Sequence, residues 1–216
     1  SGSGPYVVTG TAETQVGPLV RTELTVQAGA HPLDRFKAVR LVKEGQHPLR
    51  GAILFLPPLG TTFSFYEQRD SNGALGTSIA EFFALRGYDV WGLGPRYEGI
   101  PAGTCEAGLV DCSIMGSWDL ASMVDDATFV RSQIAGTKAV TGGASLGGML
   151  ALAVANAHPG DYDGILVWEG MLFTPDPVVV ALNQGYCAAL VAQLAGGAVF
   201  DGLGTNGFQM VTHASH

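Results

Sequence analysis

Two kinds of apolar pattern alternate along the chain from about residue 20 onward. Short runs rich in β-branched and aromatic residues predict strands, and longer stretches with an apolar residue at every third or fourth position predict helices. The expected strands span residues 20–26, 36–42, 51–56, 88–93, 138–141 and 164–168, and the expected helices span residues 78–85, 119–134 and 146–157. Strands that alternate with helices predict an α/β protein with a mainly parallel sheet.

The first two expected strands differ from the later ones. Residues 20–26 alternate between apolar and polar positions, so we expect an edge strand there, and residues 36–42 alternate less cleanly. Both suit an antiparallel start to the sheet. The continuous apolar runs at 51–56 and 164–168 instead predict strands that are buried on both faces.

The pattern changes after Pro175. Residues 178–194 have helical spacing, and the remainder is rich in glycine without a clear strand–helix pair. We therefore expect one core over residues 1–175. Residues 176–216 are expected to form the start of a helical lid, or a connecting segment.

The segment Gly143-Ala144-Ser145-Leu146-Gly147 carries the clearest chemistry in the chain. It has the Gly-x-Ser-x-Gly pattern and lies between a predicted strand and a predicted apolar helix, as a nucleophile elbow requires. The serine of such an elbow sits on a tight, strained turn, so its neighbours must be small. The helix that follows directs free N–H groups at a developing oxyanion. An idle serine in a glycine-rich turn is the alternative interpretation.

With this elbow, the sequence resembles the α/β-hydrolase family over roughly residues 20 to 172. Leu54-Phe-Leu-Pro-Pro-Leu-Gly60 stands where the family has an apolar strand and its oxyanion loop. Val90-Trp-Gly-Leu-Gly-Pro-Arg-Tyr-Glu-Gly99 resembles the family's next strand and arginine motif, with Arg96 on the arginine. The resemblance implies an α/β-hydrolase sheet with flanking helices and antiparallel first strands.

The resemblance also implies roles for individual residues. Ser145 would be the nucleophile, and the amides of Leu59 and Leu146 would form the oxyanion hole. Pro57 and Pro58 replace the usual His-Gly of the oxyanion loop. Because proline has no N–H, Leu59 is the first residue after this strand that can donate.

The family places an acid and then a histidine after the serine. Glu169 follows an expected strand, where some relatives, the haloalkane dehalogenases among them, have the acid; a salt bridge to the lid is the alternative role. His158 ends the helix behind the elbow, where the helix dipole favours histidine, and is discounted. His213 would need Asp201 and two further strands, and we find no such strands in the sequence. We therefore expect a complementary C-terminal chain, or a missing C-terminal half, to carry the base.

These residues predict an enzyme, a serine hydrolase that cleaves an ester or related acyl bond through an acyl-enzyme on Ser145 and needs no cofactor. Two alternatives stay open. One is a non-catalytic α/β-hydrolase-like binding module, and the other is a complete lidless esterase that uses His213. Phe63, Phe65 and Tyr66 beside the oxyanion loop indicate either an apolar pocket for a small ester or ordinary core.

Composition narrows the list of partners. The net charge of −8 argues against nucleic acid, which binds basic surfaces. No apolar run approaches the roughly 18–20 residues that a membrane-spanning helix needs. The cysteines lack the spacing and the neighbouring histidine of a metal site.

The three cysteines give information on the cellular compartment of the protein. Cys105 and Cys112 share one loop, and we expect a disulfide between them, with two free thiols as the alternative. A disulfide would indicate an oxidising compartment, so we expect a secreted or periplasmic protein, although no signal peptide is visible in this chain. Cys187 is either bonded to a partner outside this chain or a small buried thiol.

Overall fold

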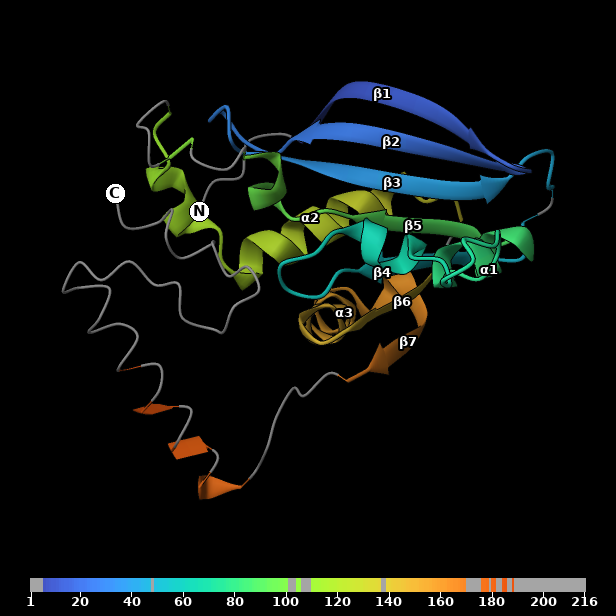
Figure 1. Cartoon of the computed structure of the whole chain (residues 1–216). Helices are drawn as coiled ribbons and strands as arrows, with labels where there is room; N and C mark the ends of the chain where they lie inside the picture. Colours follow the sequence, from blue (N-terminus) through green and yellow to red (C-terminus); the bar gives the residue numbers. More distant parts are fainter. Residues whose placement is uncertain are drawn as a thin grey trace.

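A computed structural model of the chain describes residues 6–47, 49–100, 104–105, 110–136 and 139–169, together with residues 176–178, 180–181, 184–185 and 188. Its centre is one seven-stranded sheet with helices on both faces (Figure 1). Across the sheet the strands run in the order β1-β2-β3-β5-β4-β6-β7. The strands are β1 (Val7–Val16), β2 (Leu19–Gln27), β3 (Arg35–Lys43), β4 (Ala52–Leu56), β5 (Asp89–Leu93), β6 (Ala139–Ala144) and β7 (Tyr162–Trp168).

The helices follow the expected segments closely. They are α1 (Ile79–Leu85), α2 (Leu120–Gln133) and α3 (Leu146–Ala157). Ser78 and Asp119 cap α1 and α2, each accepting a hydrogen bond from the backbone N–H three residues later. Four 3₁₀ segments lie in the connections: η1 (Phe63–Glu67), η2 (Arg96–Gly99), η3 (Ser113–Ser117) and η4 (Pro159–Asp161).

The sheet has the two parts that the sequence predicts. β1, β2, β3 and β5 pair antiparallel in succession, whereas β5 with β4, β4 with β6 and β6 with β7 pair parallel. In the sheet, β5 lies next to β4 on one side and β6 lies next to β4 on the other, so the order of the strands reverses at β4. This reversal makes the carboxyl ends of β4 and β6 the place where open α/β sheets bind their ligands.

The prediction of an edge strand at residues 20–26 is wrong. β2 is covered on its outer side by β1, with Val20 opposite Gln15. β1 is not predicted from the sequence because its stretch Thr9-Gly-Thr-Ala-Glu-Thr-Gln15 has no apolar alternation. All but the last of its residues are exposed, so neither face needed to be apolar.

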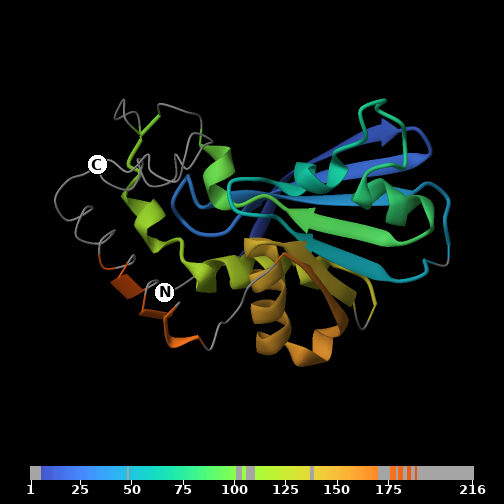
Figure 2. The ribbon, with the colours of Figure 1, turned by 60° about the horizontal axis from the view of Figure 1, so that its bottom comes forward.

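Alternate residues of β4 pack into two separate cores. Leu54 and Leu56 face α2 and α3, whereas Ile53 and Phe55 face α1 and η1. Figure 2 shows α1 on one side of the sheet and α2 and α3 on the other. All five residues of β4 are buried, as the continuous apolar run predicts.

The prediction that residues 164–168, now part of β7, are buried on both faces is wrong. Ile165 and Leu166 are each 42% exposed. Among the described residues β7 pairs with β6 alone, and it is packed less completely than β4.

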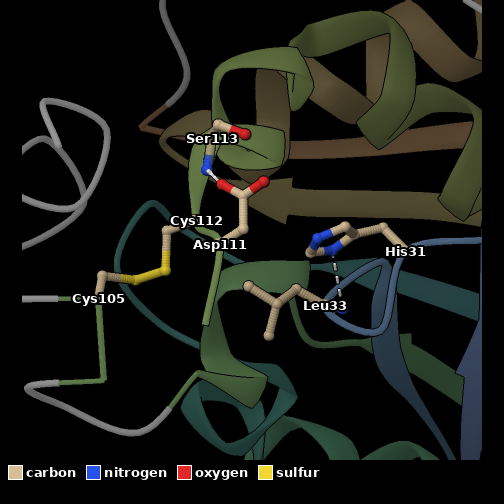
Figure 3. The surroundings of a disulfide bond; sticks show 6 residues. All are labelled: His31, Leu33, Cys105, Asp111, Cys112 and Ser113. Carbon is tan, nitrogen blue, oxygen red and sulfur yellow. Dashed lines mark hydrogen bonds between the residues drawn. A yellow bond between two sulfur atoms is a disulfide. The ribbon is translucent and has the colours of Figure 1, made fainter. Parts of the chain in front are cut away.

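Cys105 and Cys112 form a disulfide, with their Cα atoms 5.7 Å apart (Figure 3). Both are buried in a small apolar cluster with Leu33 and Met115, against which Tyr97 and Trp118 pack. The disulfide prediction is therefore confirmed.

Several predictions fall largely or wholly on residues outside the described part of the chain. These are the lid over residues 176–216, Cys187, Asp201 and His213. Val178, Val180 and the other described residues between 177 and 188 have helical backbone, and the division at residue 175 stays a prediction. No helix of the described residues is long and apolar enough to cross a bilayer.

Candidate active site

Ser145 occupies the turn between β6 and α3, at the carboxyl edge of the sheet. It is exposed, and its backbone has φ 53° and ψ −123°. A residue other than glycine rarely adopts a positive φ, and such backbone conformations persist only where the surroundings impose them. The strained strand–turn–helix placement that the sequence predicts for this serine is therefore present.

Glycines make this turn possible. A Cβ atom on Gly143 would lie 2.5 Å from the carbonyl oxygen of Leu56 and 2.5 Å from the carbonyl carbon of Gly147. A Cβ atom on Gly147 would overlap the same Leu56 oxygen. The start of α3 thus lies directly against the end of β4, and the two glycines allow that approach.

The N-terminus of α3 supplies candidate oxyanion donors. The amides of Gly148 and Met149 donate to the carbonyl oxygen of Ser145, at 3.0 and 3.2 Å. Leu146 is the first residue of α3, so no helical carbonyl lies four residues before its N–H. This N–H lies one residue from the serine, at the positive end of the helix dipole.

The loop after β4 carries the second candidate donor. Thr61 donates to the carbonyl oxygen of Pro58 from both its amide, at 3.2 Å, and its hydroxyl, at 2.9 Å, which closes a tight turn. The amide of Gly60 donates to the hydroxyl of Tyr97 at 3.0 Å. Within the described residues, no hydrogen bond uses the N–H of Leu59. Leu59 and Leu146 thus lie on the two segments that meet at Leu56, and their role as an oxyanion hole stays a prediction.

Tyr66 joins these two segments through its hydroxyl, which the sequence does not predict. Its hydroxyl donates to the carbonyl oxygen of Leu56 at 2.6 Å and accepts from the amide of Ala144 at 3.1 Å. Tyr66 and Phe63 are fully buried. For Phe63 and Tyr66 the core interpretation is correct, since both are buried and neither lines the cavity at this site.

An apolar cavity of about 30 Å³ lies beside the elbow. It is enclosed by the loop after β4, η2, α2 and the first turns of α3. Its lining residues are Pro57, Pro58, Leu93, Pro95, Arg96, Tyr97, Trp118, Ser122, Met123, Asp126, Leu146 and Leu150. This cavity is far smaller than the roughly 300–1,000 Å³ of an ordinary ligand pocket, so it has room only for a small apolar group.

Arg96 forms the polar wall of this cavity. Its guanidinium donates to both carboxylate oxygens of Asp126, at 2.8 and 2.7 Å, and to Asp34 at 3.0 Å. Trp118 donates its indole N–H to Asp34 at 2.7 Å, and Tyr6 donates to Asp126 at 2.9 Å. Burial raises the pKa of Asp126, while the adjacent Arg96 opposes that rise. Because each buried charge has a partner, Arg96 holds these segments together and is not free to bind a ligand.

Glu169 directly follows β7, the strand that pairs with the strand before Ser145. Ala144 and Trp168 are register partners, so Ser145 and Glu169 are the next residue along each strand. The amide of Ser145 donates to the carbonyl oxygen of Trp168 at 3.3 Å. Glu169 is exposed, with φ 56°. The predicted acid therefore lies at the correct edge of the sheet, and its role is untested.

None of the described histidines contacts Ser145. His158 follows the last residue of α3, about 18 Å along the helix from the serine. His47 follows β3, whose carboxyl end lies at the opposite edge of the sheet because β3 is antiparallel to β5. His31 accepts the Leu33 amide at 3.2 Å near the disulfide (Figure 3). The described residues also contain no cluster of ligands suited to a metal ion.

Comparison with solved structures finds similar chains. A candidate lipase from Sulfolobus solfataricus matches with a TM-score of 0.61 and 17% identity, over 78% of this chain and 54% of that one. An α/β-hydrolase enzyme from the sediment metagenome of the Mar Chica lagoon, Morocco, matches with a TM-score of 0.43 and 15% identity, over 85% of this chain and 63% of that one. No family model and no curated protein matches the sequence.

The chain has the α/β-hydrolase fold. It spans about half, 54%, of the length of the Sulfolobus protein. At 17% identity that similarity defines the fold, so the activity has to be argued from the site itself.

Proposed function

We propose that this protein is a serine hydrolase that cleaves an ester, or a related acyl bond, through an acyl-enzyme on Ser145. The hydroxyl of Ser145 attacks the carbonyl carbon, and the amides of Leu59 and Leu146 stabilise the oxyanion that forms. A histidine removes the proton of the serine and returns it to the leaving group. Water then attacks the acyl-enzyme by the reverse sequence of steps.

One observation carries the proposal. Ser145 is an exposed residue with φ 53° on a turn that only glycine neighbours permit. A fold gains no stability from a strained serine, and such strain is typical of functional sites. The cavity beside Leu146 supports an acyl group that is small and apolar, because its walls are mostly proline, leucine and methionine side chains.

We further propose that Glu169 is the acid and that the base lies outside the described residues. His213 is one candidate for the base, and a histidine of a complementary C-terminal chain is the other. An oxidising compartment, extracellular or periplasmic, is proposed from the Cys105–Cys112 disulfide.

A fluorophosphonate probe tests this function directly. The natively purified protein, with any chain that accompanies it, is incubated with the probe, and mass spectrometry locates the modified peptide. We expect one modified serine, Ser145, and hydrolysis of short p-nitrophenyl esters. Ser145→Ala should lose both, whereas Ser71→Ala, in an exposed turn, should retain both. A natively purified sample without modification of Ser145 would instead identify a non-catalytic binding module.

A further inference from the structure

The hydroxyl of Tyr66 lies between the two strands that carry the candidate site. The ladder between β4 and β6 ends at the pair Leu56 and Gly143. Beyond this pair, the Tyr66 hydroxyl donates to Leu56 and accepts from Ala144, the residue before the nucleophile. One side chain thus bridges the start of the oxyanion loop and the start of the elbow.

Tyr97 holds the other end of the same loop. Its hydroxyl accepts the amide of Gly60, one residue after the candidate donor Leu59. Tyr97 belongs to η2, which follows β5, so this contact fixes the loop to a different strand from the one that Tyr66 reaches. The loop between the two contacts contains Pro57 and Pro58, which have no amide hydrogen of their own to fix its position.

We infer that Tyr66 and Tyr97 are positioning residues, whose hydroxyls hold the amide of Leu59 at a fixed place relative to Ser145. This inference rests on the proposed function of that serine. An oxyanion donor is effective only when it is already oriented toward the place where charge develops. A displacement of about 1 Å at a reacting centre can lower a rate by roughly 100-fold.

The burial of Tyr66 strengthens its part in this arrangement. The side chain is fully buried, and burial raises the pKa of its hydroxyl to about 12. The hydroxyl is therefore protonated at neutral pH and remains a donor to Leu56. If it is removed, the buried carbonyl of Leu56 and the buried amide of Ala144 both lose their partner. These two groups lie directly beside the segments that carry Leu59 and Ser145.

Phenylalanine variants separate positioning from packing, because they remove only the oxygen atom. Tyr162→Phe is a matched control. Tyr162 is also buried, with a pKa raised to about 12 by burial, but its hydroxyl has no hydrogen-bond partner among the described residues. Each variant is assayed with a p-nitrophenyl ester, and the rate is divided by the number of active sites that a fluorophosphonate titrates. This division removes the effect of unfolded protein on the rate.

For Tyr66→Phe we expect kcat per titrated site to fall roughly 10- to 100-fold, with KM nearly unchanged. Tyr97→Phe should have a smaller effect in the same direction. The affinity for a trifluoromethyl ketone, which forms an oxyanion on the serine, should fall by the same factor as kcat. Hydrogen exchange should accelerate at the amide of Ala144 in Tyr66→Phe and at the amide of Gly60 in Tyr97→Phe. Tyr162→Phe should match the wild type in all of these measurements.

Three outcomes would overturn the inference, and they are distinct. A wild-type kcat per titrated site in both Tyr66→Phe and Tyr97→Phe, even with a lower melting temperature, would leave the tyrosines a purely structural role. A wild-type protein that neither reacts with the probe nor hydrolyses esters would overturn the proposed function and, with it, the inference. Unchanged hydrogen exchange at both amides would contradict the geometry independently of activity.

Discussion

Replacing Gly147 by alanine tests whether the contact between β4 and α3 is as close as the structure has it. The added methyl group would overlap the carbonyl oxygen of Leu56 and lie 2.9 Å from the carbonyl oxygen of Pro57. Both obstacles belong to the backbone, so neither can turn aside as a flexible side chain would. Overpacking in a tight site costs about 1–3 kcal/mol, and the rigid surroundings place this variant near 3 kcal/mol.

The same displacement should affect the candidate active site. Relief of the overlap requires α3 to move away from Leu56, which also moves the amide of Leu146 and the hydroxyl of Ser145. We therefore expect the rate of fluorophosphonate labelling to fall roughly 100-fold in the fraction that remains folded.

Urea unfolding and labelling kinetics measure the two effects separately. Gly160→Ala is the matched control, because a Cβ atom at Gly160 would meet nothing within 4 Å. Its unfolding free energy should stay within about 0.5 kcal/mol of the wild type, as expected for a surface substitution without a special role. Equal unfolding midpoints and equal labelling rates for the two alanine variants would refute the reasoning.

Two further predictions concern single carboxylates. Glu81→Gln should lower the free energy of unfolding by about 1–3 kcal/mol at pH 7, because it removes a buried carboxylate that accepts from Arg69 at 2.6 Å and from the Gly76 amide at 2.8 Å. Burial opposes the charge of Glu81, but these donors hold its pKa below the ordinary glutamate value. Its stabilising effect is therefore present above that value and is lost as the pH falls through the lowered pKa, so the two proteins should converge in strong acid. Glu169→Gln should lower kcat by roughly 100- to 10,000-fold without a change in KM, as measured by ester hydrolysis.

Each of these predictions has a clear contrary result. A stability difference between wild type and Glu81→Gln that stays constant from pH 7 to strong acid would show that ionisation of Glu81 is not involved. A wild-type kcat in Glu169→Gln would remove this carboxylate from the mechanism. In that case the acid must lie elsewhere in the chain or in a partner.

The regular elements of the α/β core were readable from the sequence because burial leaves a strong pattern there. The run from Ala52 to Leu56 is apolar throughout since both of its faces pack against helices. The strand β1 left no such pattern. Its residues are held by ladder hydrogen bonds to β2, and pairing through the backbone does not require apolar side chains. The exposure of Ile165 and Leu166 in β7 was not predictable either, because a local apolar pattern does not say how many neighbours a strand has in the sheet.

The site was predictable to a similar extent. The position of Ser145 followed from the glycine pattern, since Gly143 and Gly147 each lie where a Cβ atom would collide with nearby backbone. The roles of the Tyr66 and Tyr97 hydroxyls could not be anticipated. Their partners, Ala144 and Gly60, are distant in sequence, and the hydrogen bonds use backbone atoms that every residue possesses. Only the arrangement of β4, β5 and β6 in space brings these groups together.

The backbone at the ends of β6 and β7 links Ser145, the candidate nucleophile, to the candidate acid Glu169. Ser145 and Glu169 are the two non-glycine residues with positive φ in the described part of the chain, at 53° and 56°. They follow a pair of register partners, so the two strained residues are neighbours across the sheet. The amide of Ser145 donates to the carbonyl of Trp168, which couples the peptide before Glu169 to the turn that holds the serine. Strain at one of these residues could reflect only a tight turn. Strain at both, on adjacent strand ends at the carboxyl edge of an α/β sheet, is the structural reason to test Glu169 before any other carboxylate as the partner of the base.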